Sequence, residues 1–190
     1  MGEKVNLTQG HIGTTLTKLA LPIMGTSFVQ MTYSLTDMFW VGRLGSNAVA
    51  AVGTAGFFAW FSMSLVLLSK VGAEVFVAKS LGKDDESGAQ DYARSAIHLN
   101  LFLAVIYAAI LLILRTPLIG FFNLGDPAVI SLSRGYLTIL AFGMLFSFIN
   151  PVLTSIFNGS GNSRTPFIIN LTGLALNMVL DPLLINGLGP

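Results

Sequence analysis

Five apolar stretches, each close to or longer than the roughly 20 residues that a helix needs to cross a bilayer, make up most of the 190-residue sequence. Short polar loops such as LGKDDESG (81–88) and NGSGNSRTP (158–166) separate them. Only 10% of the residues are charged, whereas a soluble domain carries about 25%. Such a chain cannot cover a water-facing surface. We therefore predict an all-α integral membrane protein.

The apolar stretches predict five transmembrane helices, at approximately residues 16–41, 48–80, 92–114, 129–157 and 167–185. The segment RTPLIGFFNLGDP (115–127) is expected to be a turn-rich connection near the membrane interface, and Asn150-Pro151 is expected to kink the fourth helix. Five is an odd number, and neither half of the chain repeats the other. A cavity built on these helices needs more of them, so we interpret residues 1–190 as part of a longer protein.

Charge and cysteine content exclude several classes of partner and predict an orientation. The net charge of +1 gives no reason to expect nucleic-acid binding, and the absence of cysteine excludes disulfides and thiolate metal sites. Cytoplasmic loops are enriched in Lys and Arg. A cytoplasmic N-terminus in a multi-pass plasma-membrane protein places six basic residues inside and three outside: Lys4, Lys18, Lys79, Lys83, Arg94 and Arg164 against Arg43, Arg115 and Arg134.

Two acidic residues lie inside the apolar segments, Asp37 in the first and Asp181 in the fifth. Each lies roughly 25–29 Å along its helix from the predicted cytoplasmic end, so both reach a similar depth. Asn177 precedes Asp181 by one helical turn, and Gln30, Tyr33 and Asp37 share one face of the first helix. We expect Asp37, Asn177 and Asp181 to form one site.

An aspartate at mid-helix depth costs roughly 2.5–3.5 kcal/mol to insert. A buried pair of carboxyl groups with an amide oxygen suits a proton or a hard cation such as Na+. Binding of either would neutralise the site, and a helix that repacks on neutralisation acts as a transport switch. An intramembrane aspartyl protease also needs two acids, but the sequence has no Gly-x-Gly-Asp stretch, so we do not expect an enzyme.

With these residues in view, the sequence resembles the multidrug and toxic compound extrusion (MATE) family. The resemblance rests on three stretches: LALPIMGTSFVQMTYSLTDMFWVGRLGSNAVAAVG (19–53), KVGAEVFVAKSLGKDD (70–85) and GNSRTPFIINLTGLALNMVLDPLLING (161–187). It implies a twelve-helix antiporter of two six-helix lobes, with this chain as the first five helices of the N-terminal lobe. It also implies a missing C-terminal lobe that packs against this one.

The resemblance further implies a cation site built from a first-helix aspartate and a fifth-helix Asn-x-x-x-Asp, which correspond to Asp37, Asn177 and Asp181. The site would bind H+ or Na+, and no other cofactor is expected. Gln30, Tyr33 and Asn150 are expected to line a cavity for organic, often cationic, small molecules. Two alternatives stay open: a lipid-linked sugar flippase of a related superfamily, and a transporter fragment without activity of its own.

Overall fold

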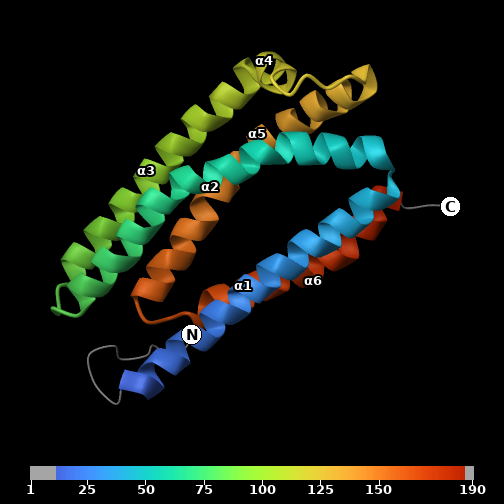
Figure 1. Ribbon diagram of the computed structural model, residues 1–190. Coiled ribbons are helices and arrows are strands. Elements are labelled where there is room, and N and C mark those ends of the chain that lie inside the picture. Colours follow the sequence, from blue (N-terminus) through green and yellow to red (C-terminus); the bar gives the residue numbers. More distant parts are fainter. Residues whose placement is uncertain (1–11, 187–190) are drawn as a thin grey trace. The chain divides into compact units, whose positions relative to one another are not determined.

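The computed structural model describes residues 12–186, so Lys4 and its predicted place inside the cell lie outside the described residues. These residues form six helices: α1 (Ile12–Arg43), α2 (Ser46–Leu81), α3 (Glu86–Ile113), α4 (Arg115–Gly120), α5 (Pro127–Gly159) and α6 (Arg164–Asn186) (Figure 1). Within this part of the chain every regular element is a helix. The prediction of an all-α architecture is confirmed.

The five long helices begin two to six residues before the predicted apolar segments. At three of them, α3, α5 and α6, a polar capping residue starts the helix. Asp85 caps α3, where its Oδ1 accepts the backbone N–H of Gly88 at 2.9 Å. Asp126 accepts the N–H of Ala128 at 2.8 Å at the start of α5. Asn162 accepts the N–H of Thr165 at 3.2 Å at the start of α6. Each cap satisfies a backbone donor that a helix leaves free at its N-terminus.

Among residues 12–186, four helices are long and apolar enough to cross a membrane: α2, α3, α5 and α6 up to Ile185. The remaining long helix, α1, has 32 residues but a more polar composition. Its hydroxyl groups are largely satisfied within the helix, because five of them donate to the carbonyl four residues earlier: Thr17, Thr26, Ser27, Thr32 and Ser34. Hydroxyls that are hydrogen-bonded in this way lower the cost of placing a helix in lipid.

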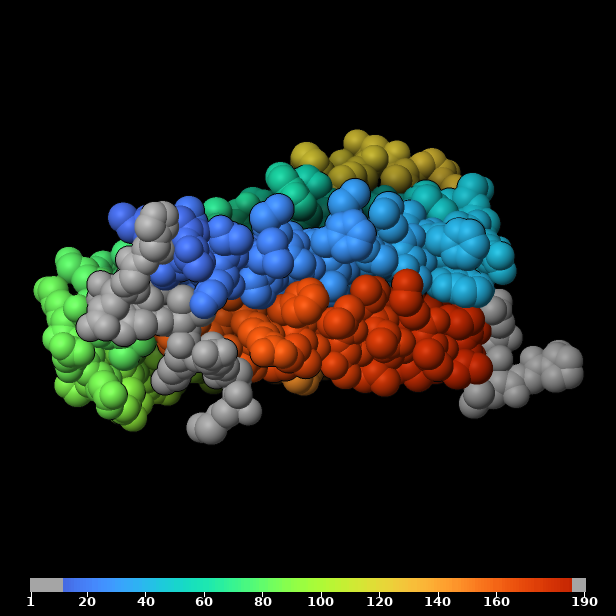
Figure 2. Space-filling view, turned by 90° about the horizontal axis from the view of Figure 1, so that it is seen from below, coloured from blue at the N-terminus to red at the C-terminus, as the bar shows by residue number. Residues whose placement is uncertain are grey.

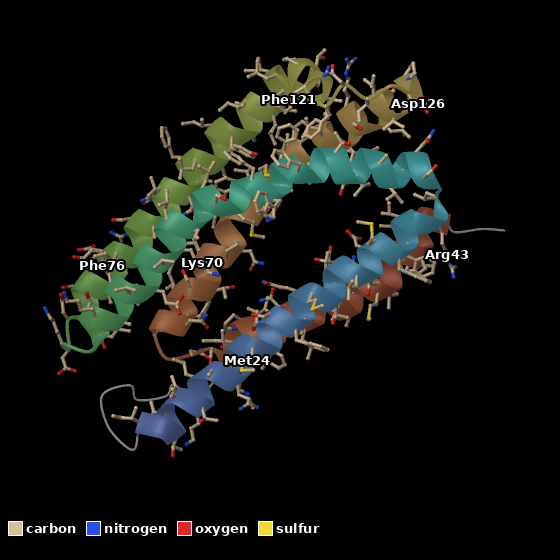
Figure 3. The ribbon with its side chains drawn as sticks, viewed as in Figure 1. Met24, Arg43, Lys70, Phe76, Phe121 and Asp126 are labelled. Atoms are coloured by element: carbon tan, nitrogen blue, oxygen red, sulfur yellow. The ribbon has the colours of Figure 1, made fainter. Side chains whose placement is uncertain are left out.

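The connection between α3 and α5 is more ordered than predicted. Residues 115–120 form the short helix α4, with Ile119 fully buried on its inner side. Asn123, with φ of 47°, then turns the chain before Asp126 starts α5. Phe121 and Asp126 mark the two sides of this turn in Figure 3.

The chain divides into two compact units that cut across the helices. One unit contains residues 12–40, 73–93 and 154–186, and the other contains residues 41–72 and 94–153. The first unit therefore holds most of α1, all of α6 and the neighbouring ends of α2, α3 and α5. The second unit holds α4 and the larger parts of α2, α3 and α5.

In the first unit, α1 and α6 lie side by side along their length (Figures 1 and 2). Phe167 of α6 packs against Gly25 of α1 so closely that a Cβ on Gly25 would lie 2.7 Å from its ring. A second close approach joins α5 to α2, where a Cβ on Gly159 would lie 2.6 Å from the carbonyl oxygen of Glu74. Glycine leaves room for the Phe167 ring in the first contact and for the backbone of α2 in the second.

The second unit has a core of tightly packed apolar side chains and a few polar contacts between helices. Leu111 of α3 and Leu137, Met144 and Phe148 of α5 are almost completely buried. The Asn100 amide donates to the hydroxyl of Ser69, which joins α3 to α2. The Tyr107 hydroxyl donates to the carbonyl of Phe58 at 2.7 Å and joins the same two helices.

Candidate functional site

The three side chains predicted to form a cation site meet in the first unit. Asn177 and Asp181 lie one turn apart on α6, and the Asn177 amide donates to Asp181 Oδ1 at 2.6 Å. The carboxyl group of Asp37, on α1, lies within hydrogen-bonding reach of the Asp181 carboxyl group. Two acids from the first and last long helices, 144 positions apart in sequence, are therefore in direct contact.

The register of α1 against α6 explains why these two carboxyl groups meet. Gly25 contacts Phe167 near one end of the helix pair, and Asp37 contacts Asp181 further along. The two contacts are separated by about 18 Å on α1 and about 21 Å on α6. The helices therefore run in the same direction, as expected of two spans that cross the membrane the same way.

Two oxygen atoms of this cluster are buried without a hydrogen-bond donor, namely Asn177 Oδ1 and Asp181 Oδ2. Buried polar atoms almost always have a partner, so such a pair marks a place where a ligand would be stabilised. Carboxylate and amide oxygens are the ligands that hard cations take. A proton on either carboxyl group would also turn the contact between Asp37 and Asp181 into a hydrogen bond.

Tyr33 lies on the same side of α1 and is close enough to interact electrostatically with both Asp37 and Asp181. Its side chain is 41% exposed, so the phenol stands at the edge of the carboxyl pair. Gln30 is exposed one turn earlier on α1. Asn150 is exposed on α5 in the second unit, and its predicted place in a substrate cavity stays a prediction.

An open groove runs next to this site, between α1 and α6. Its lining residues were not predicted: Thr32, Leu35, Thr36, Phe39, Trp40 and Met178. Thr32, Thr36 and Phe39 follow one another at spacings of four and three and share a face of α1. Spacing from Asp37 indicates only Trp40, three positions later, so it could not have identified the groove. In residues 12–186, no group of three or more His, Cys, Asp or Glu side chains could hold a metal ion. The cluster therefore has two acids and an amide, rather than a transition-metal ligand set.

Comparison with known proteins points to membrane transporters. Residues 22–183 match the MatE family model. The chain is 30% identical over 174 residues to a probable multidrug resistance protein NorM of Thermotoga maritima, covering 90% of this chain and 37% of that protein. It is 27% identical over 195 residues to an FAD transporter of Shewanella oneidensis, covering 100% of this chain and 42% of that protein.

The solved structures that match this chain are also transporters. An outward-facing multidrug resistance MATE family transporter matches with a TM-score of 0.85 and 30% identity, covering 98% of this chain and 41% of that one. A MOP superfamily transporter from Pyrococcus furiosus matches with a TM-score of 0.83 and 29% identity, covering 98% of this chain and 41% of that one. The chain thus spans about 40% of the length of the transporters it matches.

Proposed function

The chain belongs to the MatE family of membrane transporters, and we propose that it is the N-terminal lobe of a cation-coupled antiporter that exports organic small molecules. In this proposal Asp37, Asn177 and Asp181 bind the coupling ion, H+ or Na+. The observation that carries the proposal is the meeting of these three side chains with two buried oxygens that lack a donor. A second lobe, absent from this chain, would complete the transporter.

The arrangement of the site suggests how ion binding drives transport. With no cation present, two ionised carboxylates in contact repel each other, and low-dielectric surroundings strengthen the repulsion. A proton or Na+ between them removes it and holds α1 against α6. Release of the ion would therefore favour a different packing of the two helices. Each inward-moving positive charge gains about 2.3 kcal/mol per 100 mV of membrane potential.

The substrate class is proposed from the relatives. Several are named multidrug resistance proteins, including PmpM of Pseudomonas aeruginosa, which is 30% identical over 173 residues. Another is named an FAD transporter. We propose aromatic, organic substrates. The groove of Thr32, Leu35, Thr36, Phe39, Trp40 and Met178 beside the cation site offers apolar and hydroxyl surface for such a molecule.

The test is efflux of a fluorescent organic cation from proteoliposomes that contain the complete transporter. Asp37→Asn and Asp181→Asn remove the carboxylates while keeping the size of each side chain. We expect each to lower ion-driven efflux at least tenfold, since the site can no longer change its charge. Asp91→Asn on α3 is the matched control, because Asp91 is an exposed acid far along the sequence from either residue, and it should leave efflux unchanged.

Separate arms with a pH gradient and with a Na+ gradient identify the coupling ion. Efflux driven by only one gradient in the wild type, and lost in both carboxylate variants, would support the proposal and name the ion. Efflux at the wild-type rate by a correctly inserted Asp37→Asn or Asp181→Asn protein would refute the role assigned to the pair.

A further inference from the structure

Two arginines in the second unit lie close together at one end of the helices. Arg115 begins α4, and its Nη1 donates to the Thr138 hydroxyl of α5 at 3.4 Å. Arg134 lies one turn before Thr138 on the same helix, and its carbonyl accepts the Thr138 hydroxyl at 2.8 Å. Thr138 therefore brings the Arg115 guanidinium to the helical turn that carries Arg134.

Neither arginine has an acidic partner among residues 12–186. No ion pair involves Arg115 or Arg134, and Arg134 Nε is buried without a hydrogen-bond acceptor. Asp126, the acidic residue at the start of α5, hydrogen-bonds to other groups. Its Oδ1 accepts the Ala128 N–H, and its Oδ2 accepts the Asn47 amide of α2 at 3.3 Å. A guanidinium group without an anionic partner is costly in low-dielectric surroundings, so an anion beside the two arginines would be stabilised.

The two arginines lie near the ends of apolar spans, where lipid headgroups are expected. Arg115 comes two residues after the apolar span of α3 ends at Ile113. Arg134 lies seven residues into α5, about 11 Å from its start. Long arginine side chains in such positions extend toward the membrane surface and keep their charged ends at the headgroup level.

Exposed apolar side chains lie within six residues of one or other of the two cations along the chain. Ile113, Phe121 and Ile139 are 76%, 81% and 72% exposed. Phe121 is held in place by its neighbour Phe122, whose ring lies edge-on to Phe57 and Phe58 of α2 with centroids 5.8 and 5.9 Å apart. A fixed apolar surface beside two cations fits a molecule with an anionic head and hydrocarbon tails.

We propose that Arg115 and Arg134 bind the phosphate of an anionic phospholipid, with its acyl chains lying against Ile113, Phe121 and Ile139. Arginine suits this role because its planar guanidinium matches the oxygen geometry of a phosphate. Binding would supply a negative charge to two guanidinium groups that have no acidic partner among residues 12–186. The proposal is independent of ion coupling, since it concerns a different unit and involves no residue of the cation site.

The test is native mass spectrometry of the 190-residue chain released from detergent micelles, with phosphatidylglycerol and phosphatidylcholine of identical acyl chains as competing lipids. We expect the wild type to retain phosphatidylglycerol in preference to phosphatidylcholine. Each arginine near a membrane surface contributes roughly a fivefold preference for anionic lipid. Arg115→Gln and Arg134→Gln should each reduce the preference by about this factor, and the double variant should nearly abolish it. Circular dichroism checks that the helices persist.

Arg94→Gln is the matched control, because it removes the same charge from an exposed position near the other end of α3. The Arg94→Gln variant should keep the full preference for phosphatidylglycerol. A wild type without preference, or an Arg94→Gln protein that loses as much as the double variant, would overturn the proposal. Displacement of the lipid by millimolar soluble glycerol phosphate would also overturn it, because the site would then recognise the phosphate alone.

Discussion

At the scale of single residues, Asp85 shows how one side chain outside the membrane spans defines where a helix begins. Its carboxylate accepts the Gly88 N–H at 2.9 Å and the Ser87 hydroxyl at 3.0 Å. These hydrogen bonds, first that of Gly88 and then that of Ser87, with a smaller contribution from Lys83, hold the pKa of Asp85 below its ordinary value of 3.8. Hydrogen bonds to the ionised form have this effect.

The lowered pKa predicts that the cap weakens in acid. Because the pKa is lower in the folded state, the cap contributes fully above about 3.8, the value of the unfolded chain, and is lost as pH falls through the lower folded value. Carbon-detected NMR titration of the Asp85 carboxyl should give a midpoint below 3.8. Amide exchange in the first turn of α3 should accelerate through the same pH range.

Variants at the cap separate its charge from its geometry. Gly88→Ala should return the Asp85 midpoint toward 3.8, because the new Cβ would lie 2.1 Å from Asp85 Oδ2 and displace the carboxylate. Asp85→Asn keeps a hydrogen-bond acceptor but cannot be protonated in this range, so amide exchange in the first turn of α3 should no longer depend on acid. Asp84→Asn is the control, since asparagine tolerates the φ of 58° at that position. An unchanged midpoint in Gly88→Ala would contradict this account of the cap.

At the scale of helices, hydropathy locates the long elements but not their ends or their contacts. The predicted third helix began at residue 92, because the polar first turns of α3 read as a loop although Asp85 starts the helix at Glu86. The six residues of α4 are too few to show a helical period, and they contain Pro117. Short elements of this kind depend on tertiary contacts, such as those of Ile119 and Phe122, that no local pattern contains.

The sequence likewise predicted the residues of the candidate site but not the helix packing that brings them together. Spacing alone places Asn177 and Asp181 one turn apart. The contact of Asp181 with Asp37 further requires the register of α1 against α6, which depends on Gly25 lying under Phe167. A glycine in an apolar segment does not reveal its partner: Gly53 and Gly56 lie in a small-residue stretch of α2, yet a Cβ on either would meet no atom within 4 Å.

The crossing of α5 and α2 provides a prediction about helix packing. Gly159→Ala would place a Cβ 2.6 Å from the Glu74 carbonyl oxygen and 3.2 Å from its Cα. Backbone cannot move aside as a flexible side chain can, so the helices must separate. We expect a loss of about 1–3 kcal/mol in the free energy of unfolding, seen as a lower thermal midpoint in detergent.

Gly143→Ala on the same helix is the matched control for that measurement. A Cβ at position 143 meets nothing within 4 Å, and alanine is the better helix former by about 1 kcal/mol. This variant should unfold at the same temperature or higher. Equal destabilisation by the two substitutions would mean that helix propensity, and not the crossing with Glu74, determines the response at position 159.

At the scale of the whole molecule, the side of the membrane on which residue 14 lies depends on whether α1 crosses the bilayer with the four more apolar helices. If α1 crosses, five crossings in succession place the loops alternately on the two sides of the bilayer. Residue 14, the loop at 82–85 and the loop at 160–163 would then share one side. The turn at Gly45 and the turn at Asn123 would share the other. Without α1 as a span, residue 14 would lie with Gly45 instead.

The sequence has no cysteine, so single cysteines introduced at Thr14, Gly45, Lys83, Asn123 and Ser160 can be labelled without background. We expect a membrane-impermeant maleimide applied outside intact cells to label positions 45 and 123, and to label 14, 83 and 160 only after permeabilisation. Positions 14, 83 and 160 are expected on the cytoplasmic side because Lys and Arg are in excess near them. The hydrogen bonds of the α1 hydroxyls and the contact of Asp37 with Asp181 of α6 are the reasons to expect α1 in the bilayer. Labelling of position 14 together with position 45 in intact cells would show that these contacts do not suffice to insert α1. The Asp37 carboxyl group would then lie outside the membrane.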